Sequence, residues 1–296
     1  MPDLSSARDR AQRTFATARR RSGLLDHGLR TQEQYSAVQG SMHAGAITYY
    51  GVLSFFPLLA LSFFVVGYLA RVFPNAEQAL ETAVEQLFPG VFGGGADQLS
   101  LADLERLAGT LGLVGLLGAL YTGLGWLSAT RSALLAVFDL PSEEYPSFLL
   151  GKARDLAALV SLGTLLLLSV AVSGFVSHYA RQLLEWVGLG TDLGFALTLL
   201  SVVLGVASAV LLFWLMFTLL ARPHAPRRSL WLGALLGAVA FEALKRLASY
   251  LLTFTTQAPA FQLFGITLIL IVWISYFSRI TLYAAAWAHT RRPVAV

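Results

Sequence analysis

Composition separates this chain from soluble proteins. It has 296 residues, of which 56% are apolar and 13% charged, and its mean hydropathy is +0.66. Soluble domains carry about 25% charged residues, so these values exclude an ordinary soluble domain, a disordered chain and a coiled coil. The absence of cysteine excludes disulfides and thiolate-based catalysis or metal binding. The formal charge of +4 is distributed in a way that points to membrane orientation and not to nucleic acid.

Residues 1–43 form a polar, arginine-rich arm without the apolar segment of a cleavable signal peptide, so we expect the first span to insert as an uncleaved anchor. We also expect a short amphipathic helix in this arm. Its seven arginines either set the topology or bind anionic lipid heads, each adding about 1 kcal/mol near the surface. No aromatic pattern interleaves them, which disfavours nucleic acid as a partner.

Six apolar stretches follow, and each is long enough to cross about 30 Å of hydrocarbon as a helix. They lack the alternation of barrel strands, so the sequence predicts an all-α, polytopic membrane protein. The predicted spans are about 47–70, 111–132, 156–177, 193–220, 230–253 and 265–287, within a membrane domain of residues 44–290 and before a short tail, 291–296.

Basic residues alternate from loop to loop. The arm, the loops after the second and fourth spans, and the tail are rich in Lys and Arg. The three loops on the other side hold only three basic residues, Arg71, Arg106 and Arg181. Because loops rich in Lys and Arg stay in the cytoplasm, this pattern predicts a multi-pass protein with both termini inside the cell.

The first outer loop is too long to be a simple connection. Asn75 with Gln78 resembles a capping box, and Ser100 with Asp103 opens a second helical pattern. We therefore expect two short amphipathic helices on the outer face. A cover over the bundle is the simpler role, and a gate is the alternative.

Pro57 lies near the middle of the first span, where it frees the carbonyl of Leu53 and predicts a kink. Tyr49, Tyr50 and Ser54 are near enough to satisfy freed backbone groups or to line a polar cleft. Because prolines are common in membrane helices, packing alone is the simpler interpretation.

The fifth span carries three ionisable residues, Glu242, Lys245 and Arg246. Each costs about 2.5–3.5 kcal/mol at the centre of a membrane helix. Their i+3 and i+4 spacing puts them on one helical face, where they can pair. Gly233 and Gly237 lie on roughly the opposite face and suit close helix packing. We expect this helix to be wedged between neighbours with its charged side towards a polar interior.

Arg279, in the sixth span, falls near the depth of Glu242 and could pair with it. The resulting cluster is either a structural set of ion pairs or a substrate or ion pathway. Its excess positive charge would suit an anionic substrate such as a phosphate-bearing lipid head. Arg131 and Asp155 lie at the ends of the second and third spans, and we expect both to snorkel to the interface.

Signatures of catalysis are missing. The five histidines show no metal-ligand spacing, and no phosphate-binding glycine loop or serine nucleophile elbow is present. The sequence therefore predicts no metal, no cofactor and no enzyme activity.

Two stretches resemble the signature of the YihY/BrkB family of bacterial inner-membrane proteins. They read AGAITYYGVLSFFPLL at 44–59 and GALLGAVAFEALKRLASY at 233–250. The resemblance covers about residues 30–290. The sixth span departs from the family pattern, because the usual Gly-Ala-Glu ending is replaced by Tyr-Ala-Ala-Ala at 283–286 and Arg279 lies within the helix.

The resemblance implies six helices, both termini inside, and a link to envelope integrity and lipid-related transport. We predict a transporter or flippase-like protein for an anionic lipid or amphiphile, with membrane lipids as partners. The alternative is a non-transporting structural or interaction protein of the envelope, and an oligomer of identical chains remains open. A ribonuclease, an old label of the family, ranks third because the residues do not support it.

Overall fold

The computed structural model of the chain describes residues 23–70, 101–187, 191–255 and 259–291, with side chains over 23–62, 117–169, 202–248 and 268–291. Within these ranges every regular element is a helix. In chain order they are α2 (Gly23–Ala37), α3 (Gly40–Ala70), α5 (Leu101–Val137), the 3-10 turn η1 (Ser142–Glu144), α6 (Phe148–Val187), α7 (Thr191–Leu215), the π-helix η2 (Met216–Ala221), α8 (Arg227–Thr255) and α9 (Pro259–Thr290).

Each of the six predicted spans lies within helical structure, and the fourth runs from α7 into η2. Three stretches in the described part are long and apolar enough to cross a membrane: Gly40–Ser62, Val202–Ala221 and Leu268–Thr290. The all-helical fold is therefore confirmed. The first predicted loop helix, in residues 71–100, lies outside the described residues, and the second is continuous with α5, which begins at Leu101.

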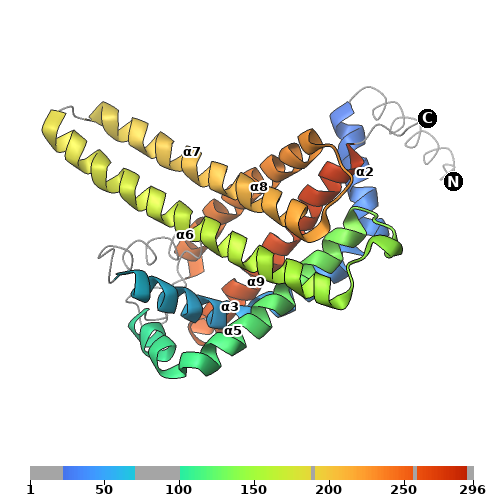
Figure 1. The fold of residues 1–296 in the computed structure, drawn as a ribbon. Helices are drawn as coiled ribbons and strands as arrows, with labels where there is room; N and C mark the ends of the chain where they lie inside the picture. Colours follow the sequence, from blue (N-terminus) through green and yellow to red (C-terminus); the bar gives the residue numbers. More distant parts are fainter. Residues whose placement is uncertain (1–22, 71–100, 188–190, 256–258, 292–296) are drawn as a thin grey trace.

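The helices pack as neighbouring pairs (Figure 1). α3 lies along α5, and α8 lies between α7 and α9. α6 and α7 run side by side and extend away from the other helices, while α2 packs on α9. α9 also contacts α3 and α5, and α5 contacts α6 and η2, so both α9 and α5 connect the helix pairs of the bundle.

An aromatic cluster fills the space between α7, η2, α8 and α9. Phe213 and Phe217 are fully buried. The ring centre of Phe213 lies 6.3 Å from that of Phe241 and 5.8 Å from that of Phe277, and Trp273 stacks on Phe277 at 5.8 Å. Each such pair contributes about 0.5–1.5 kcal/mol beyond the burial of its surface. This cluster fixes the rotation of α8 and α9 about their axes.

Small residues bring α8 and α9 into backbone contact. A Cβ atom placed on Gly233 would lie 2.7 Å from the carbonyl oxygen of Ala284 and 2.7 Å from the Cβ of Ala288. At Gly237 a Cβ would lie 3.1 Å from the Cβ of Ala284. The close packing that the glycine spacing predicts is therefore confirmed.

The described part of the arm contains the expected amphipathic helix. In α2, His27, Thr31 and Tyr35 recur every four residues and are buried. His27 stacks on Trp287 of α9 with ring centres 3.8 Å apart, and its Nε2 donates a hydrogen bond of 3.0 Å to the Trp287 carbonyl. Tyr35 stacks on Tyr283 at 4.0 Å. Burial lowers the pKa of His27, and the hydrogen bond to the Trp287 carbonyl acts in the opposite direction.

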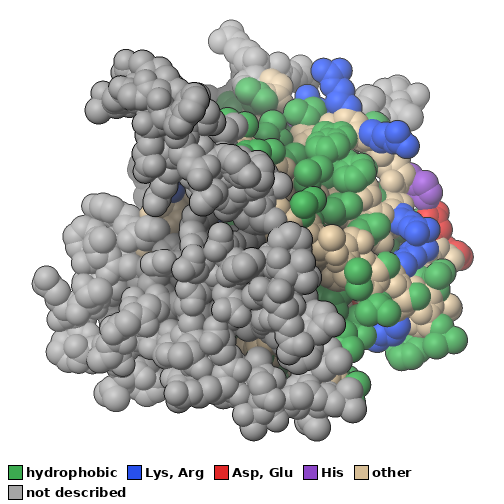
Figure 2. Space-filling model, turned by 60° about the vertical axis from the view of Figure 1, so that its left-hand side comes forward, with side chains coloured by type: hydrophobic (Ala, Val, Ile, Leu, Met, Phe, Trp, Pro, Cys, Tyr) green, Lys and Arg blue, Asp and Glu red, His purple; other side chains and the backbone are tan. Residues whose placement is uncertain are grey.

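The outer surface suits a lipid environment. Large apolar side chains such as Tyr121, Val160 and Val239 are more than half exposed. Figure 2 shows a broad apolar face that is bordered along one edge by Lys and Arg side chains. Exposed apolar area of this extent marks a surface covered by another phase or molecule, and a basic border is typical of a membrane boundary.

The glycine contact yields a stability prediction. Gly233→Ala is expected to lower the stability of the purified protein by about 1–3 kcal/mol, because the added methyl group meets the α9 backbone. Gly163→Ala is the matched control, since nothing lies within 4 Å of a Cβ at that helical position. Thermal unfolding followed by tryptophan fluorescence measures both. An unchanged midpoint for Gly233→Ala would contradict the close contact.

Candidate functional site

The charged residues of α8 form a local network. Lys245 Nζ lies 2.7 Å from Glu242 Oε2, and Arg246 Nε lies 3.7 Å from Glu242 Oε1. The side chains of Glu242 and Lys245 are 23% and 20% exposed, whereas that of Arg246 is 69% exposed. The i+3 and i+4 pairing that the spacing predicts is therefore present, with Arg246 at the open side of the network.

Lys245 also points towards the aromatic cluster. Its Nζ lies 5.5 Å from the ring centre of Phe241, and Phe241 packs edge-on against Trp273 at 5.4 Å. A carboxylate on one side and a ring face on the other offset the cost of holding an ammonium group among apolar helices. Glu242 and Lys245 thus largely compensate each other.

Arg279 lies apart from this network. Its ion pair with Glu242 is not formed, and no carboxylate of the described residues pairs with it. Its Cζ lies 5.9 Å from the ring centre of Tyr276, one turn earlier in α9. Arg279 is therefore a cation in an apolar helix that is balanced within the described residues by an aromatic face alone.

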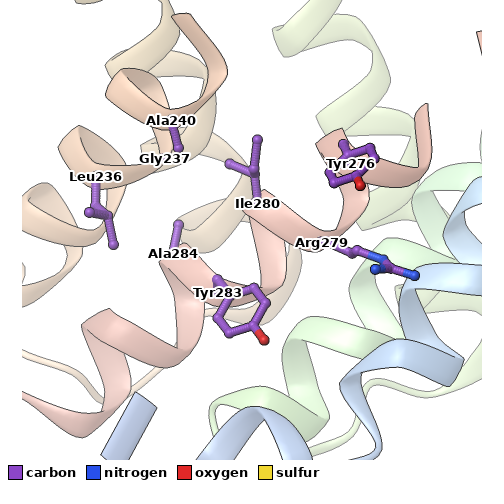
Figure 3. Close-up of a pocket in the computed structure, with 8 residues that line it drawn as sticks. All are labelled: Leu236, Gly237, Ala240, Tyr276, Arg279, Ile280, Tyr283 and Ala284. Atoms are coloured by element: carbon purple, nitrogen blue, oxygen red, sulfur yellow. The ribbon is translucent and has the colours of Figure 1, made fainter. Parts of the chain in front are cut away.

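A pocket of about 270 Å³ lies between α8 and α9 at Arg279 (Figure 3). α9 supplies its polar groups, and α8 supplies an apolar wall. The lining residues are Leu236, Gly237, Ala240, Tyr276, Arg279, Ile280, Tyr283 and Ala284. The lining is mostly apolar, as is usual for a small-molecule pocket, and its polar groups belong to Tyr276, Arg279 and Tyr283.

The arm helix holds one wall of this pocket in place. The hydroxyl of Tyr283 donates a hydrogen bond of 2.7 Å to Gln32 Oε1, and the ring of Tyr283 stacks on Tyr35. Both partners belong to α2. The position of Tyr283 in the pocket therefore depends on the docking of α2 against α9.

The residues near Pro57 are not part of this pocket. Tyr49 and Tyr50 are 62% and 42% exposed on α3. Ser54 is buried and donates a hydrogen bond of 3.1 Å to the carbonyl of Gly51. Pro57 lies inside α3, which continues as one helix through it. A polar cleft formed by these four residues stays a prediction.

A buried ion pair joins α5 to α6, and sequence reasoning missed it. Arg131 Nε and Nη2 donate to the two carboxylate oxygens of Asp155 at 2.8 and 3.2 Å. Asp155 is completely buried and the side chain of Arg131 is 13% exposed, so neither snorkels as expected. A Cβ on Gly151 would lie 2.9 Å from Arg131 Nη2, so the glycine leaves room for the guanidinium group.

Opposite charges at facing ends of two consecutive helices were the signal for this pair. The α5–α6 connection contains the turn η1 and is short, so it brings the two helix ends together. Within the described residues, no group of three or more His, Asp or Glu could hold a metal ion.

Taken together, the fold and these buried charges define an α-helical membrane protein with ionisable groups inside its helical bundle. The chain belongs to the Virulence factor BrkB family, whose model matches residues 31–294. The resemblance of the two glycine-rich stretches to the YihY/BrkB family is thus confirmed.

Two relatives illustrate the range of the family. The inner membrane protein YhjD of Escherichia coli (strain K12) is 27% identical over 94% of this chain and 84% of its own length. The UPF0761 membrane protein RSc1559 of Ralstonia nicotianae is 30% identical over 83% of this chain and 54% of its own length. No solved structure matches this chain.

The buried pair yields a second prediction. Asp155→Asn is expected to destabilise the protein by about 3 kcal/mol or more, because it leaves the Arg131 charge without its partner. Asp139→Asn is the control. Asp139 is exposed just after the end of α5, and its positive φ of 50° suits asparagine. The thermal unfolding midpoints of the two variants, each compared with wild type, measure the difference.

Replacement of both partners by apolar residues should restore part of the lost stability. The double variant Arg131→Met with Asp155→Leu tests this. Equal midpoints for Asp155→Asn and Asp139→Asn would show that the pair does not hold α5 to α6.

Proposed function

We propose that this chain is a multi-pass protein of the bacterial inner membrane that moves an anionic lipid or amphiphile across the bilayer. In this proposal the six long helical segments cross the membrane, and both termini lie in the cytoplasm. The apolar length of the segments and the alternation of basic loops support that arrangement. Movement of lipid through such a bundle requires no cofactor and no catalytic residue, so the protein is not an enzyme.

The observation that carries the proposal is the depth and setting of Arg279. At 1.5 Å per residue it lies roughly 16 Å along α9 from Thr290, near the middle of a hydrocarbon layer of about 30 Å. Its cost there is about 2.5–3.5 kcal/mol. No carboxylate of the described residues offsets that cost, and the side chain lines a pocket. An anionic group that enters the pocket would supply the missing counter-charge.

The lining of the pocket suits an amphiphile. A guanidinium group binds the oxygens of a phosphate through paired hydrogen bonds. The apolar side chains Leu236 and Ile280 offer a surface for the first part of an acyl chain. A volume of about 270 Å³ holds a small head group, and the rest of the chain would stay in the bilayer.

The network on α8 provides a second position along the path. Glu242 lies roughly 22 Å along α8 from Arg227. It is therefore farther from the predicted cytoplasmic side than Arg279, which lies roughly 16 Å along α9 from Thr290. Protonation of Glu242 would release Lys245 and raise the local positive charge. If transport is coupled to protons, Glu242 is the carrier in this proposal.

A flux measurement tests the proposal. Fluorescent phosphatidylglycerol in proteoliposomes is expected to cross the bilayer faster with wild-type protein than in empty liposomes. Arg279→Gln should slow the movement by about tenfold or more, because it removes the cation that binds the head group. Arg228→Gln is the control, since it removes an exposed positive charge from the first turn of α8 and should leave the rate unchanged.

Three other outcomes of the flux measurement would be informative. If folded wild-type protein moves no lipid, a structural or interaction protein of the envelope is favoured. Equal movement by Arg279→Gln and Arg228→Gln would exclude the pocket as the transport site. Glu242→Gln adds a further arm, since loss of a pH-dependent rate in that variant alone would assign proton coupling to Glu242.

A further inference from the structure

Three arginines come together at the end of the bundle that carries the α5–α6 and α7–α8 connections. Arg131 belongs to α5, Arg154 to the first turns of α6, and Arg222 follows η2, which packs on both α5 and α6. Burial, and then the charges of Arg222 and Arg131, lower the pKa of Arg154. Gly151, one turn before Arg154 on α6, lies against the Arg131 guanidinium group. The charges of Arg131 and Arg222 therefore both act on Arg154, at the end of the bundle that the loop charges predict to face the cytoplasm.

The charges in this group are not balanced. Both carboxylate oxygens of Asp155 already accept hydrogen bonds, from Nε and Nη2 of Arg131. Arg154 Nε is buried and has no hydrogen-bond partner within the described residues. No carboxylate there forms an ion pair with Arg154 or Arg222, and the acid in the neighbouring turn, Glu144, contacts His224 at 3.5 Å. A buried donor without an acceptor costs free energy unless an external acceptor reaches it.

The backbone at Arg222 adds an independent observation. Arg222 ends the π-helix with φ 48° and ψ 54°, in the left-handed region, and its N–H donates to the carbonyl of Phe217 at 3.2 Å. A residue with a side chain pays about 1–2 kcal/mol for this conformation, whereas glycine adopts it freely. π-Helices are rare and frequently occur at functional sites. The backbone conformation at this position would favour glycine. The presence of arginine there is explained if its guanidinium group has a role.

We propose that Arg154 and Arg222, beside the Arg131–Asp155 pair, bind a phosphate group on the cytoplasmic side of the bundle. The planar fork of arginine matches two phosphate oxygens. Lys152, two residues before Arg154 on α6, adds a further positive charge, and its Nζ lies 3.5 Å from the Oγ of Ser128. The phosphate belongs either to a phospholipid head in the inner leaflet or to a soluble phosphate compound. The site is separate from the pocket at Arg279 and does not depend on transport.

Binding by purified full-length protein in a neutral detergent tests this site. The probes are inorganic phosphate and dioctanoyl phosphatidic acid, titrated while the thermal unfolding midpoint is followed. Wild-type protein is expected to be stabilised by at least one probe. Arg154→Gln should weaken the apparent affinity at least about tenfold, the range expected for loss of a charged hydrogen bond. Arg228→Gln, which removes an exposed charge nearby in the sequence, should bind like wild type.

Arg222→Gly separates binding from folding. It removes strain from the left-handed position, so the unfolding midpoint without probe should be no lower than in wild type. The same variant should bind the probes about tenfold more weakly. This variant also tests the site if Arg154→Gln does not fold.

The two probes identify the source of the phosphate. Stabilisation by inorganic phosphate alone would indicate a soluble compound, and stabilisation by phosphatidic acid, alone or with phosphate, would indicate a lipid head. Either result supports the site. Binding of neither probe by wild type would overturn the proposal, as would equal affinity in Arg154→Gln, Arg222→Gly and Arg228→Gln.

Discussion

Backbone contact between α8 and α9 is the constraint on which the rest of the bundle depends. Gly233 and Gly237 let α8 approach Ala284 and Ala288 of α9 without intervening side chains. At this separation Phe241 reaches Trp273 and Phe277 on one side of the contact. Gly237 and Ala284 also line the pocket that contains Arg279, so the same approach shapes that pocket. Packing of small residues, which needs no hydrophobic driving force in lipid, therefore builds both the core and the candidate site.

The charged groups on the long helices are of two kinds. Glu242 with Lys245, and Asp155 with Arg131, are paired at hydrogen-bonding distance and hold neighbouring groups or helices in place. Arg279 and Arg154 have no carboxylate partner within the described residues. Arg279 lines the pocket, and the buried Nε of Arg154 has no hydrogen-bond partner there. A paired charge has an explanation within the protein. An unpaired one points to a ligand, which is why the proposals rest on Arg279 and Arg154.

Local sequence patterns predicted the features that depend on one helix. The apolar stretches predicted the helices, the spacing of Glu242, Lys245 and Arg246 predicted their pairing, and the glycine spacing predicted close packing. Features that depend on how two helices face each other could not be predicted from those patterns. The rotation of α9 turns Arg279 away from Glu242, because the aromatic cluster and not charge pairing sets that rotation. Asp155 is buried because the α5–α6 turn delivers it to Arg131.

The central claim is that an anion can reach Arg279 at membrane depth. Because the chain has no cysteine, Ala240→Cys places one thiol in the pocket, and Val239→Cys places one at the same depth on exposed apolar surface. The measurement is the rate at which each thiol reacts with a negatively charged methanethiosulfonate reagent in proteoliposomes. The account predicts that Ala240→Cys reacts at least about tenfold faster, and that Arg279→Gln removes this advantage. Equally slow reaction of both thiols would contradict it.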